Sequence, residues 1–498
     1  MTVAQDTLAE ARGAPSLGLR LLSPSFGWLG VARARLRAAA AAEARFLLAA
    51  ALVSSAVVSA SVAVHGAVRP PKLPYLLKTL DNGLTVVLSE DHSTPIVHLQ
   101  LWYHVGSKNE RPGRTGFAHL FEHMMFKGSK NVRPEQHLTL ISRVGGEGNA
   151  YTTEDTTVFF ETVPAQYLPL VLWLEADRMA TLRIDEAVFQ AEREVVKEER
   201  RWRYESEPFG LLSEIIYDKA FAVHPYKHTP IGTMADLEAA AIADVRDFYE
   251  TYYVPENATL TLVGDFDSDE TFQLVERYLG RVPKARRRVP RDIPGEPVKR
   301  AERRISLEQD WPLPAVVVAY HITYDGHPDS YPLHIVSKIL SDGNSARIHR
   351  RLVYEDRLAV SAFGQGNILE DPNLFYAVAI VQPGRTPEES AAALLEEFER
   401  LKTSPVTDRE LQRAKNQFAR DYIIQRMSVE QKAAHLAHAA VIHGDITTTD
   451  GEFDIFMNTG KEDVQRVART YFTPENRMVL TILPRGASSS GLVNRGAR

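Results

Sequence analysis

The sequence predicts an α+β protein made of two similar domains, each with strands before and after its helices. The first observation is a repeat: YYVPEN leads into the apolar run ATLTLVG, and YFTPEN leads into RMVLTIL, with Pro255 and Pro474 219 residues apart. The second is that TPIVHLQLWYH and LPAVVVAYH show the same separation, 219 residues, between Pro95 and Pro314. Two matches at one offset indicate a duplication.

The first domain is expected over 73–290 and begins with a β-hairpin. Asp81-Asn82-Gly83 is a tight-turn signal between Lys78–Leu80 and Leu84–Leu88. Ile96–His104 alternates between apolar and polar residues as a second strand. The later patterns predict helix through about 115–143, β structure at 150–163 and helix at 185–205.

The second domain is expected over 300–485. The segment from Pro283 to Arg304 contains four prolines and no periodic pattern, which favours an interdomain linker, placed at 291–299. Duplicated halves joined by one linker often form a ligand-binding cleft. Residues 486–498 are expected to form a disordered tail.

Residues 1–72 differ in composition from the two domains. Four arginines between Arg33 and Arg45 precede the uncharged run Phe46–Val64, and small residues follow it up to Ala67. This order is typical of a secretory signal and predicts export to a bacterial periplasm. The alternatives are an uncleaved inner-membrane anchor at 46–64 facing the periplasm, and a buried Ala-rich helix.

Composition excludes several classes of function. The 58 Lys+Arg against 64 Asp+Glu leave a net charge of −6, which does not favour a nucleic-acid partner. The chain has no cysteine, so disulfides, thiolate nucleophiles and iron–sulfur clusters are excluded. A metal ion would have to be held by His, Asp or Glu.

The sharpest chemical motif is His119-Leu120-Phe121-Glu122-His123. On a helix, residues i and i+4 share a face, so the two imidazoles can reach one ion. Glu122 would lie close enough to the ion to polarise its water. The surrounding apolar residues predict a largely buried helix, and two hydrogen-bonded core histidines are the alternative.

A third ligand is expected from the helical segment ERxVVxEE. Glu192 and Glu199 are seven residues apart and share one face, with Val195 and Val196 between them. Spacing alone does not choose between Glu198 and Glu199. A solvated charged helix is the simpler interpretation of this segment by itself.

These motifs together resemble one family. HLFEH is the inverted zincin motif of the M16 (insulinase/pitrilysin-like) metallopeptidases. The resemblance covers about 73–485 and favours a half-length bacterial M16B-type subunit. It extends to LDNGLTVVLSEDHSTPIVHLQLWYHVGSKNE, GFAHLFEHMMFKGS, GGEGNAYTTEDTTVFF, the ERxVVxEE segment and HPY…PIGT.

The resemblance implies that each domain is an antiparallel-rich sheet packed with helices. It also implies that one Zn²⁺ per chain is held by His119, His123 and Glu199, with Glu192 orienting the site by hydrogen bonds. Such an ion activates a water molecule, and Glu122 would take that water's proton and pass it to the leaving amine. The implied activity is that of a metalloendopeptidase.

The segment GGEGNAYT leads into an apolar β run and by itself favours an ordinary loop and strand. In the family the matching element resembles an edge strand on which an extended substrate lies, which assigns substrate binding to Asn149, Ala150 and Tyr151. Peptides or unfolded segments would then be the substrates.

The second half has no metal motif, because the positions 219 residues after the ligands and Glu122 are Lys338, Ser341 and Asp342. Active members carry an Arg and a Tyr in this half that steady the tetrahedral intermediate, and the matching residues here are Val353 and Val360.

Three explanations remain for the two valines. Arg357 would replace the missing group if the segment were helical, or the chain would be a weak enzyme. The favoured explanation is a partner chain of the same family that lacks zinc and bears Arg and Tyr. The resemblance implies that half-length members pair, as a homodimer or as a heterodimer of unlike subunits. A catalytically inactive scaffold subunit and a non-proteolytic zinc binder are the alternatives from other functional classes.

Overall fold

The computed structural model describes residues 69–486. The expected signal or anchor at 46–64, nearly all of segment 1–72 and the tail from 487 lie outside the described residues. Within 69–486, no helix combines the length and apolar character that crossing a bilayer requires.

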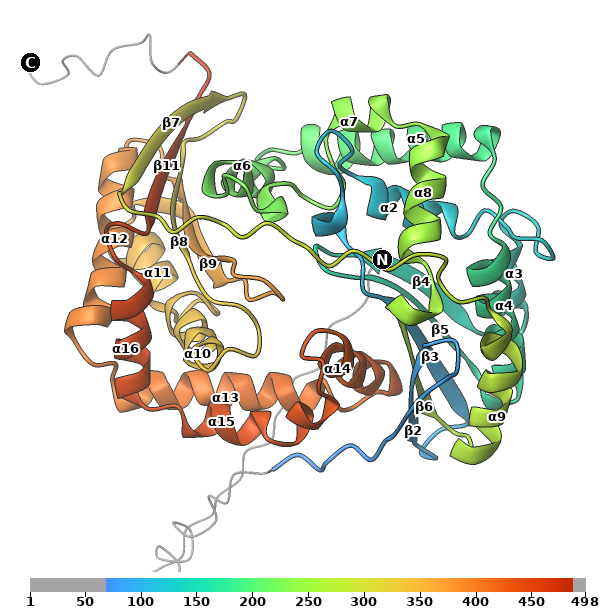
Figure 1. The fold of residues 1–498 in the computed structure, drawn as a ribbon. Coiled ribbons are helices and arrows are strands. Elements are labelled where there is room, and N and C mark those ends of the chain that lie inside the picture. Colours follow the sequence, from blue (N-terminus) through green and yellow to red (C-terminus); the bar gives the residue numbers. More distant parts are fainter. Residues whose placement is uncertain (1–68, 487–498) are drawn as a thin grey trace, which may run out of the picture. The chain divides into compact units, whose positions relative to one another are not determined.

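The first half contains a six-stranded sheet in the order β1-β2-β6-β3-β5-β4 (Figure 1). β2 and β6 run parallel and the other neighbouring strands antiparallel. The expected hairpin joins β1 to β2, and Gly83 takes a positive φ of 92° in its turn. The strands are β1 (Leu76–Thr79), β2 (Thr85–Glu90), β3 (Ile96–Tyr103), β4 (Glu147–Thr152), β5 (Thr157–Pro164) and β6 (Ala258–Gly264).

The second half repeats this arrangement in a five-stranded sheet of order β7-β11-β8-β10-β9. β7 and β11 are parallel, as are β2 and β6 in the first sheet. The two α+β halves predicted from the repeat are therefore confirmed. The strands are β7 (Arg303–Gln309), β8 (Ala315–His321), β9 (Ala359–Gly366), β10 (Leu374–Val381) and β11 (Arg477–Pro484).

The repeated PEN turns make the same hydrogen bond in both halves. The side-chain amide of Asn257 donates to the backbone oxygen of Tyr252 at 2.8 Å. The side-chain amide of Asn476 donates to the backbone oxygen of Tyr471 at 2.7 Å. The asparagine of each PEN turn thus fastens the end of the preceding helix beside the strand that follows.

The helix expected at 115–143 is in fact two helices, α2 (Phe117–Met124) and α3 (Gln136–Arg143). Gly128 takes a φ of 97° between them, and a Cβ at this position would approach the backbone oxygen of Val132 to 2.8 Å. The backbone here therefore requires glycine, and its positive φ keeps α2 and α3 from forming one helix. The sequence pattern also missed α4 (Leu168–Thr181), which covers part of the sheet.

The helix expected at 185–205 is α5 (Glu186–Arg200), which continues into a π-helical turn, η3 (Arg201–Glu205). The remaining helices of the first half are α6 (Leu212–Ala220), α7 (Met234–Ala239), α8 (Ile242–Tyr252) and α9 (Ser268–Tyr278). Those of the second half are α10 (Ser330–Leu340), α11 (Arg347–His349), α12 (Pro387–Thr403), α13 (Asp408–Ile424), α14 (Val429–Val441), α15 (Glu452–Asn458) and α16 (Lys461–Tyr471).

Helix α14 belongs to the second half in sequence but packs on the first sheet (Figure 1). Its buried Ala433 and Leu436 join one apolar cluster with Val87 of β2 and Val263 of β6. Residues 283–302 form no helix or strand, which agrees with a connecting segment. The boundaries 73–290, 291–299 and 300–485 stay a prediction.

Candidate metal centre

Helix α2 presents both histidines on the face opposite to its buried side. Phe117, Leu120, Phe121 and Met124 are buried in the first core. His119 and His123 keep 14% and 23% of their side chains exposed, and their ring centroids lie 4.9 Å apart. The i, i+4 spacing therefore produces the expected imidazole pair.

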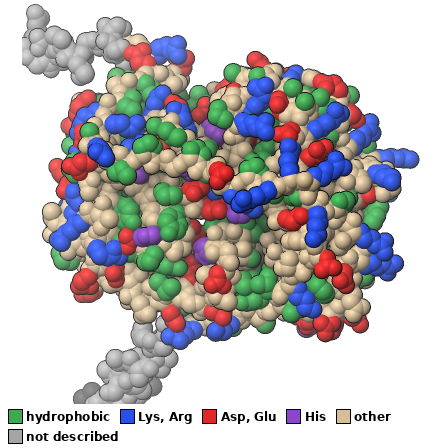
Figure 2. All heavy atoms as spheres, in the orientation of Figure 1, with side chains coloured by type: hydrophobic (Ala, Val, Ile, Leu, Met, Phe, Trp, Pro, Cys, Tyr) green, Lys and Arg blue, Asp and Glu red, His purple; other side chains and the backbone are tan. Residues whose placement is uncertain are grey.

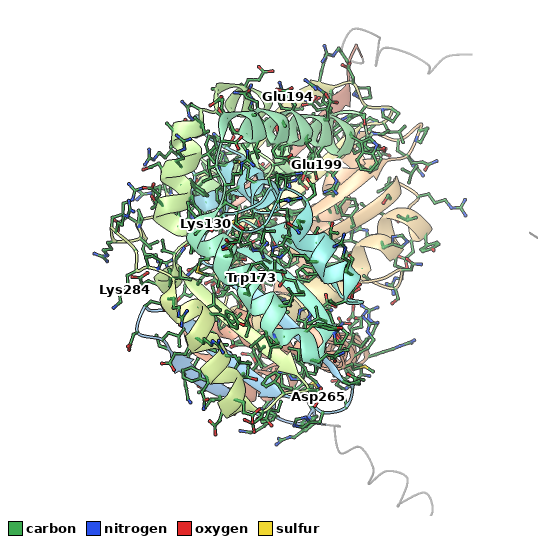
Figure 3. All side chains as sticks on the ribbon, turned by 90° about the vertical axis from the view of Figure 1, so that its right-hand side faces the viewer. Lys130, Trp173, Glu194, Glu199, Asp265 and Lys284 are labelled. Atoms are coloured by element: carbon green, nitrogen blue, oxygen red, sulfur yellow. The ribbon has the colours of Figure 1, made fainter. Side chains whose placement is uncertain are left out.

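Helix α5 supplies the carboxylates. Glu192 and Glu199 face α2, whereas Glu194 and Glu198 are exposed. Figure 3 labels Glu194 and Glu199 on this helix. Val196 packs in the core, but Val195 is exposed, so only one of the two valines expected on this face lies there. Asp185 caps the helix by accepting a hydrogen bond from the Val188 backbone N–H.

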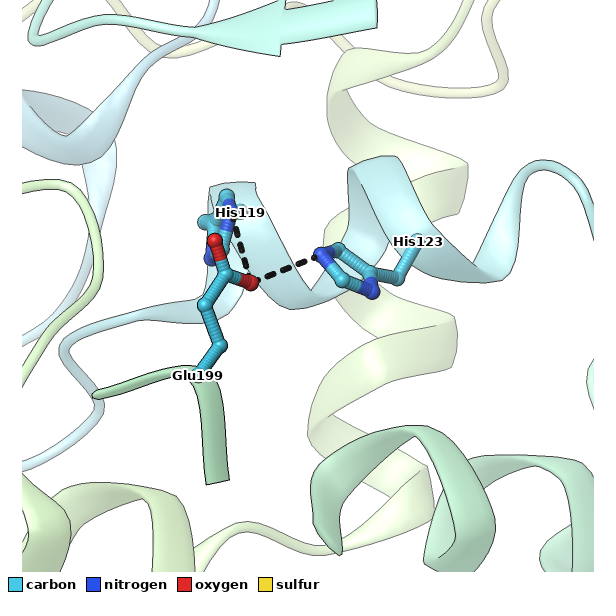
Figure 4. Close-up of side chains that lie close together, drawn as sticks. All are labelled: His119, His123 and Glu199. Carbon is cyan, nitrogen blue, oxygen red and sulfur yellow. Dashed lines mark ion pairs between the residues drawn. The ribbon is translucent and has the colours of Figure 1, made fainter. Parts of the chain in front are cut away.

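The three predicted ligands meet at one point (Figure 4). Oε2 of Glu199 lies 3.3 Å from Nε2 of His123 and 3.8 Å from Nε2 of His119. In a tetrahedral site with bonds of about 2.0–2.2 Å, ligand atoms are separated by roughly 3.3–3.5 Å. The donor set fits a zinc ion, with the His123 separation inside this range and the His119 separation 3.8 Å, slightly above it.

Other charged groups hold these ligands in place. Nδ1 of His123 pairs with Glu192 at 3.6 Å, and Lys127 pairs with Glu192 at 3.1 Å. Arg203 contacts Oε1 of Glu199 at 2.8 Å, which leaves Oε2 for the histidines. Sequence reasoning missed Lys127 and Arg203, although Arg203 follows Glu199 at the i+4 spacing that allows an ion pair.

The two histidines have opposite pKa shifts. The pKa of His119 is lowered to about 4 by burial and by the neighbouring His123. Burial also acts on His123, but its pKa is raised to about 9 because Glu192 and Glu199 stabilise its charged form. Near pH 7 without a metal ion, His119 is therefore neutral and His123 carries the proton.

Glu122 lies beside the ligands and in contact with β4. Burial raises the pKa of Glu122, and a hydrogen bond from Thr152 opposes this rise. The Thr152 hydroxyl donates to Oε2 of Glu122 at 2.6 Å. Thr152 was not predicted, but it belongs to the GGEGNAYT segment assigned to substrate binding.

The segment 147–152 is the edge strand β4, paired with β5 within the described sheet. Asn149 and Tyr151 are exposed, and Ala150 is half-buried. The backbone N–H of Ala150 donates to the Asn149 side-chain oxygen at 2.9 Å.

The valine positions of the second half lie at the end of a π-helical turn, η7 (Arg350–Glu355), and on the edge strand β9. Val353 packs against the second core and Val360 is 44% exposed. The suggestion that Arg357 shares a helical face with Val353 is wrong. The turn ends at Glu355, and Arg357 is an exposed loop residue with a φ of 49°.

Comparison with known proteins identifies the family. Residues 85–234 match the model described as "Insulinase (Peptidase family M16)", and residues 240–418 match "Peptidase M16 inactive domain". The zinc protease PqqE of Helicobacter pylori is 32% identical over 413 residues, which are 82% of this chain and 92% of that protein. The chain belongs to the M16 peptidase family.

Two further proteins are similar to this chain over most of its length. The crystal structure of a protease from Helicobacter pylori has a TM-score of 0.80 and 31% identity, covering 83% of this chain and 100% of that one. The β subunit of the mitochondrial-processing peptidase of Saccharomyces cerevisiae is 26% identical over 356 residues, which are 68% of this chain and 76% of that protein. In this M16 chain, the half without the metal motif is the half that matches the inactive domain.

Proposed function

We propose that this chain is a zinc-dependent endopeptidase that hydrolyses extended peptides or unfolded segments. One observation carries the proposal. His119, His123 and Glu199 converge on one point. Beside them, Glu122 is bonded to the last residue of an edge strand.

Nε2 of each histidine and Oε2 of Glu199 would hold one zinc ion per chain. When bound, zinc supplies a Lewis acid that polarises the scissile carbonyl and favours deprotonation of water. Thr152 occupies Oε2 of Glu122, so Oε1 is the oxygen that takes the water's proton and passes it to the leaving amine.

The edge strand β4 explains why the substrate would be extended. Pairing with a free sheet edge uses backbone hydrogen bonds, so it reads conformation more than side chains. The N–H of Ala150 is bonded to the side chain of Asn149, which a substrate carbonyl would replace. Tyr151 is 39% exposed and would contact a substrate side chain.

A second M16 subunit would complete the site. Val353 and Val360 supply neither a charge nor a hydroxyl to an oxyanion. A different M16 subunit that bears Arg and Tyr would provide them in a heterodimer, whereas a homodimer of this chain would place the same two valines in both subunits. The relative from Saccharomyces cerevisiae is itself named as a subunit.

We further propose that the enzyme acts in the periplasm or on the periplasmic side of the inner membrane. The basic flank and uncharged run before Val64 support this location. Amino-terminal sequencing of the exported protein would distinguish a cleaved signal from an anchor.

An inactive scaffold subunit is the second candidate. The match of 240–418 to an inactive domain and the two valines favour it. The complete set of ligands and the supported Glu122 favour the enzyme, because a scaffold has no need of a general base.

The test is cleavage of a quenched, unstructured peptide library by the full chain, alone and with a neighbouring M16 subunit. Chelator-sensitive turnover by the chain alone would support the enzyme and refute the need for a different partner. Turnover only with the partner would support the shared site. Zinc binding without turnover in either case would favour the scaffold.

A further inference from the structure

We propose that a second divalent transition-metal ion binds in the second half, held by Asp325, His438 and His443. Asp325 lies in the loop after β8, His438 on α14 and His443 just beyond the end of α14. Their ligand atoms lie within 4.8 Å of one another. The site is remote in sequence from the α2–α5 centre and independent of the proposed peptidase function.

The spacing of the three groups suits a metal ion. Oδ2 of Asp325 lies 3.3 Å from Nε2 of His438 and also 3.3 Å from Nε2 of His443. These separations agree with the roughly 3.3–3.5 Å between ligands of a tetrahedral ion. They are as close as the corresponding separations at the first centre, and longer than ordinary charged hydrogen bonds.

The hydrogen bonds around His443 fix its tautomer. The hydroxyl of Thr448 donates its proton to the backbone oxygen of Asp445 at 2.9 Å. It therefore accepts from Nδ1 of His443, 3.0 Å away. With the proton on Nδ1, the neutral ring points the lone pair of Nε2 at the Asp325 carboxylate.

Two lone pairs that face each other repel unless a cation lies between them. His443 is 93% buried, and its Nε2 forms no hydrogen bond with the part of the chain that is described. Oδ1 of Asp325 accepts from the Gly326 N–H, which leaves Oδ2 for the two imidazoles. No Lys or Arg among residues 69–486 forms an ion pair with Asp325, so the cation must come from outside or be a proton.

A third cluster, of one histidine and two glutamates, shows the contrast. His137, Glu161 and Glu175 also lie within reach of one ion. There, however, the guanidinium of Arg178 donates to Glu175 and Glu161 from within the cluster. That cluster already contains its cation, and the Asp325 cluster does not.

The site is accessible and has room for further ligands. The three groups line a cavity of about 500 Å³, and the His438 side chain is 45% exposed. Glu452 lines the same cavity and can supply another oxygen. His435 is not a ligand, because its Nε2 lies 2.6 Å from Nη2 of Arg426, which can only donate. Two imidazoles and carboxylate oxygens favour Zn²⁺, Co²⁺ or Ni²⁺ over Ca²⁺ or Mg²⁺.

Metal content of the full chain tests the proposal. After chelation, reloading with Zn²⁺ and gel filtration, we expect two ions per wild-type chain and one in His119→Ala, which lacks a ligand of the first centre. His438→Ala in that background should lose the remaining ion. The apparent Kd for Zn²⁺ of this double variant should be at least about 10-fold higher than that of His119→Ala alone. His349→Ala, a histidine of α11 outside the cluster, is the matched control.

Stability gives a readout that is independent of activity. In the His119→Ala background, Zn²⁺ should raise the Tm by a few degrees, because it binds only the folded chain. His438→Ala should abolish this shift without unfolding the chain, since its side chain is half exposed. Asp325→Asn, which keeps the shape of the side chain, should abolish it too.

Two results would overturn the proposal. One is a His119→Ala chain that retains no metal at micromolar Zn²⁺. The other is a second ion that survives both His438→Ala and Asp325→Asn. Either result would mean that the cluster holds a proton shared between imidazole and carboxylate instead of a metal ion.

Discussion

At the metal centre, the two histidines differ in their surroundings although they lie one helical turn apart. His123 is paired with Glu192, whereas Nδ1 of His119 is buried without a hydrogen bond to any described residue. Packing, and not a polar partner, therefore orients His119. The raised pKa of one ring and the lowered pKa of the other follow from this difference.

Replacing Glu122 tests the proton transfer. Glu122→Gln should lower kcat by about 10²- to 10⁴-fold, because the amide cannot take a proton from water. The zinc content should not change, since Glu122 is not one of the three converging ligands. Peptide turnover and metal analysis check both expectations. Glu198→Gln is the matched control, because this side chain is 71% exposed and faces away from the centre. An unchanged kcat in Glu122→Gln would contradict the assignment.

At the scale of single residues, the buried His98 makes the free energy of unfolding depend on pH. Burial lowers the pKa of His98 from 6.5 to about 4. The unfolded chain therefore binds the proton more readily, so stability is full above pH 6.5 and falls as the pH drops towards 4.

The expected loss from His98 is up to about 3 kcal/mol, at 1.36 kcal/mol per pKa unit. Urea unfolding between pH 7 and pH 4 measures it. The neutral ring lies 2.8 Å from the Thr162 hydroxyl and 3.0 Å from the Gln100 amide. His98→Gln can keep both hydrogen bonds, so its stability should fall less steeply with acid. An equal slope would contradict the prediction.

At the scale of elements, the boundary between α2 and α3 shows why α2, the helix that carries His119 and His123, is short. Local periodicity favours one helix, but α2 ends at Met124, and the positive φ of Gly128 prevents helix from continuing between α2 and α3. The chain then returns through α3 to β4, and this return brings Thr152 against Glu122.

The edge strand β4 can be tested through its backbone. Ala150→Pro removes an N–H that is bonded to the Asn149 side chain and is available at the free edge. Proline is tolerated on edge strands, so the Tm should change by only a few degrees. Loss of the substrate hydrogen bond should lower kcat/KM at least about 10-fold. Ala150→Gly keeps the N–H and should retain most of the activity, whereas equal loss in both variants would argue against backbone pairing.

At the scale of the whole molecule, the two halves share one sheet topology, but only the first half carries the metal motif. The ligands lie in the first half, and Lys338 and Asp342 at the matching positions of the second half form an ion pair with each other. Acidic and basic side chains are interspersed on the face shown in Figure 2.

Lys108 of the first half forms ion pairs with carboxylates of both halves. Its side chain is 5% exposed, and its ammonium group pairs with Asp155, Glu370 and Asp371 at 2.7–2.9 Å. Lys108→Met should cost about 3–5 kcal/mol of unfolding free energy, because the buried Asp155 and the two partly exposed carboxylates beside it lose their shared cation. Urea denaturation checks this, with Lys130→Met, an exposed lysine, changing the free energy by less than about 0.5 kcal/mol. A small effect at Lys108 would mean that solvent replaces the pair.

The sequence by itself determined the duplication, the histidine pair and the half that carries the metal motif. These features depend on local spacing: four residues along a helix face, and a constant offset between repeats. Resemblance to a family was needed to choose Glu199 over Glu198, since both lie on one helix and only the position of α2 distinguishes their faces.

Only the tertiary structure decided the features that depend on distant segments. It placed α14 on the first sheet, removed Arg357 from a helical face, set Thr152 beside Glu122 and gathered Asp325 with two histidines from around α14. The physical reason is that local periodicity specifies which face of an element is buried, whereas the partner of that face is chosen by the packing of the whole chain.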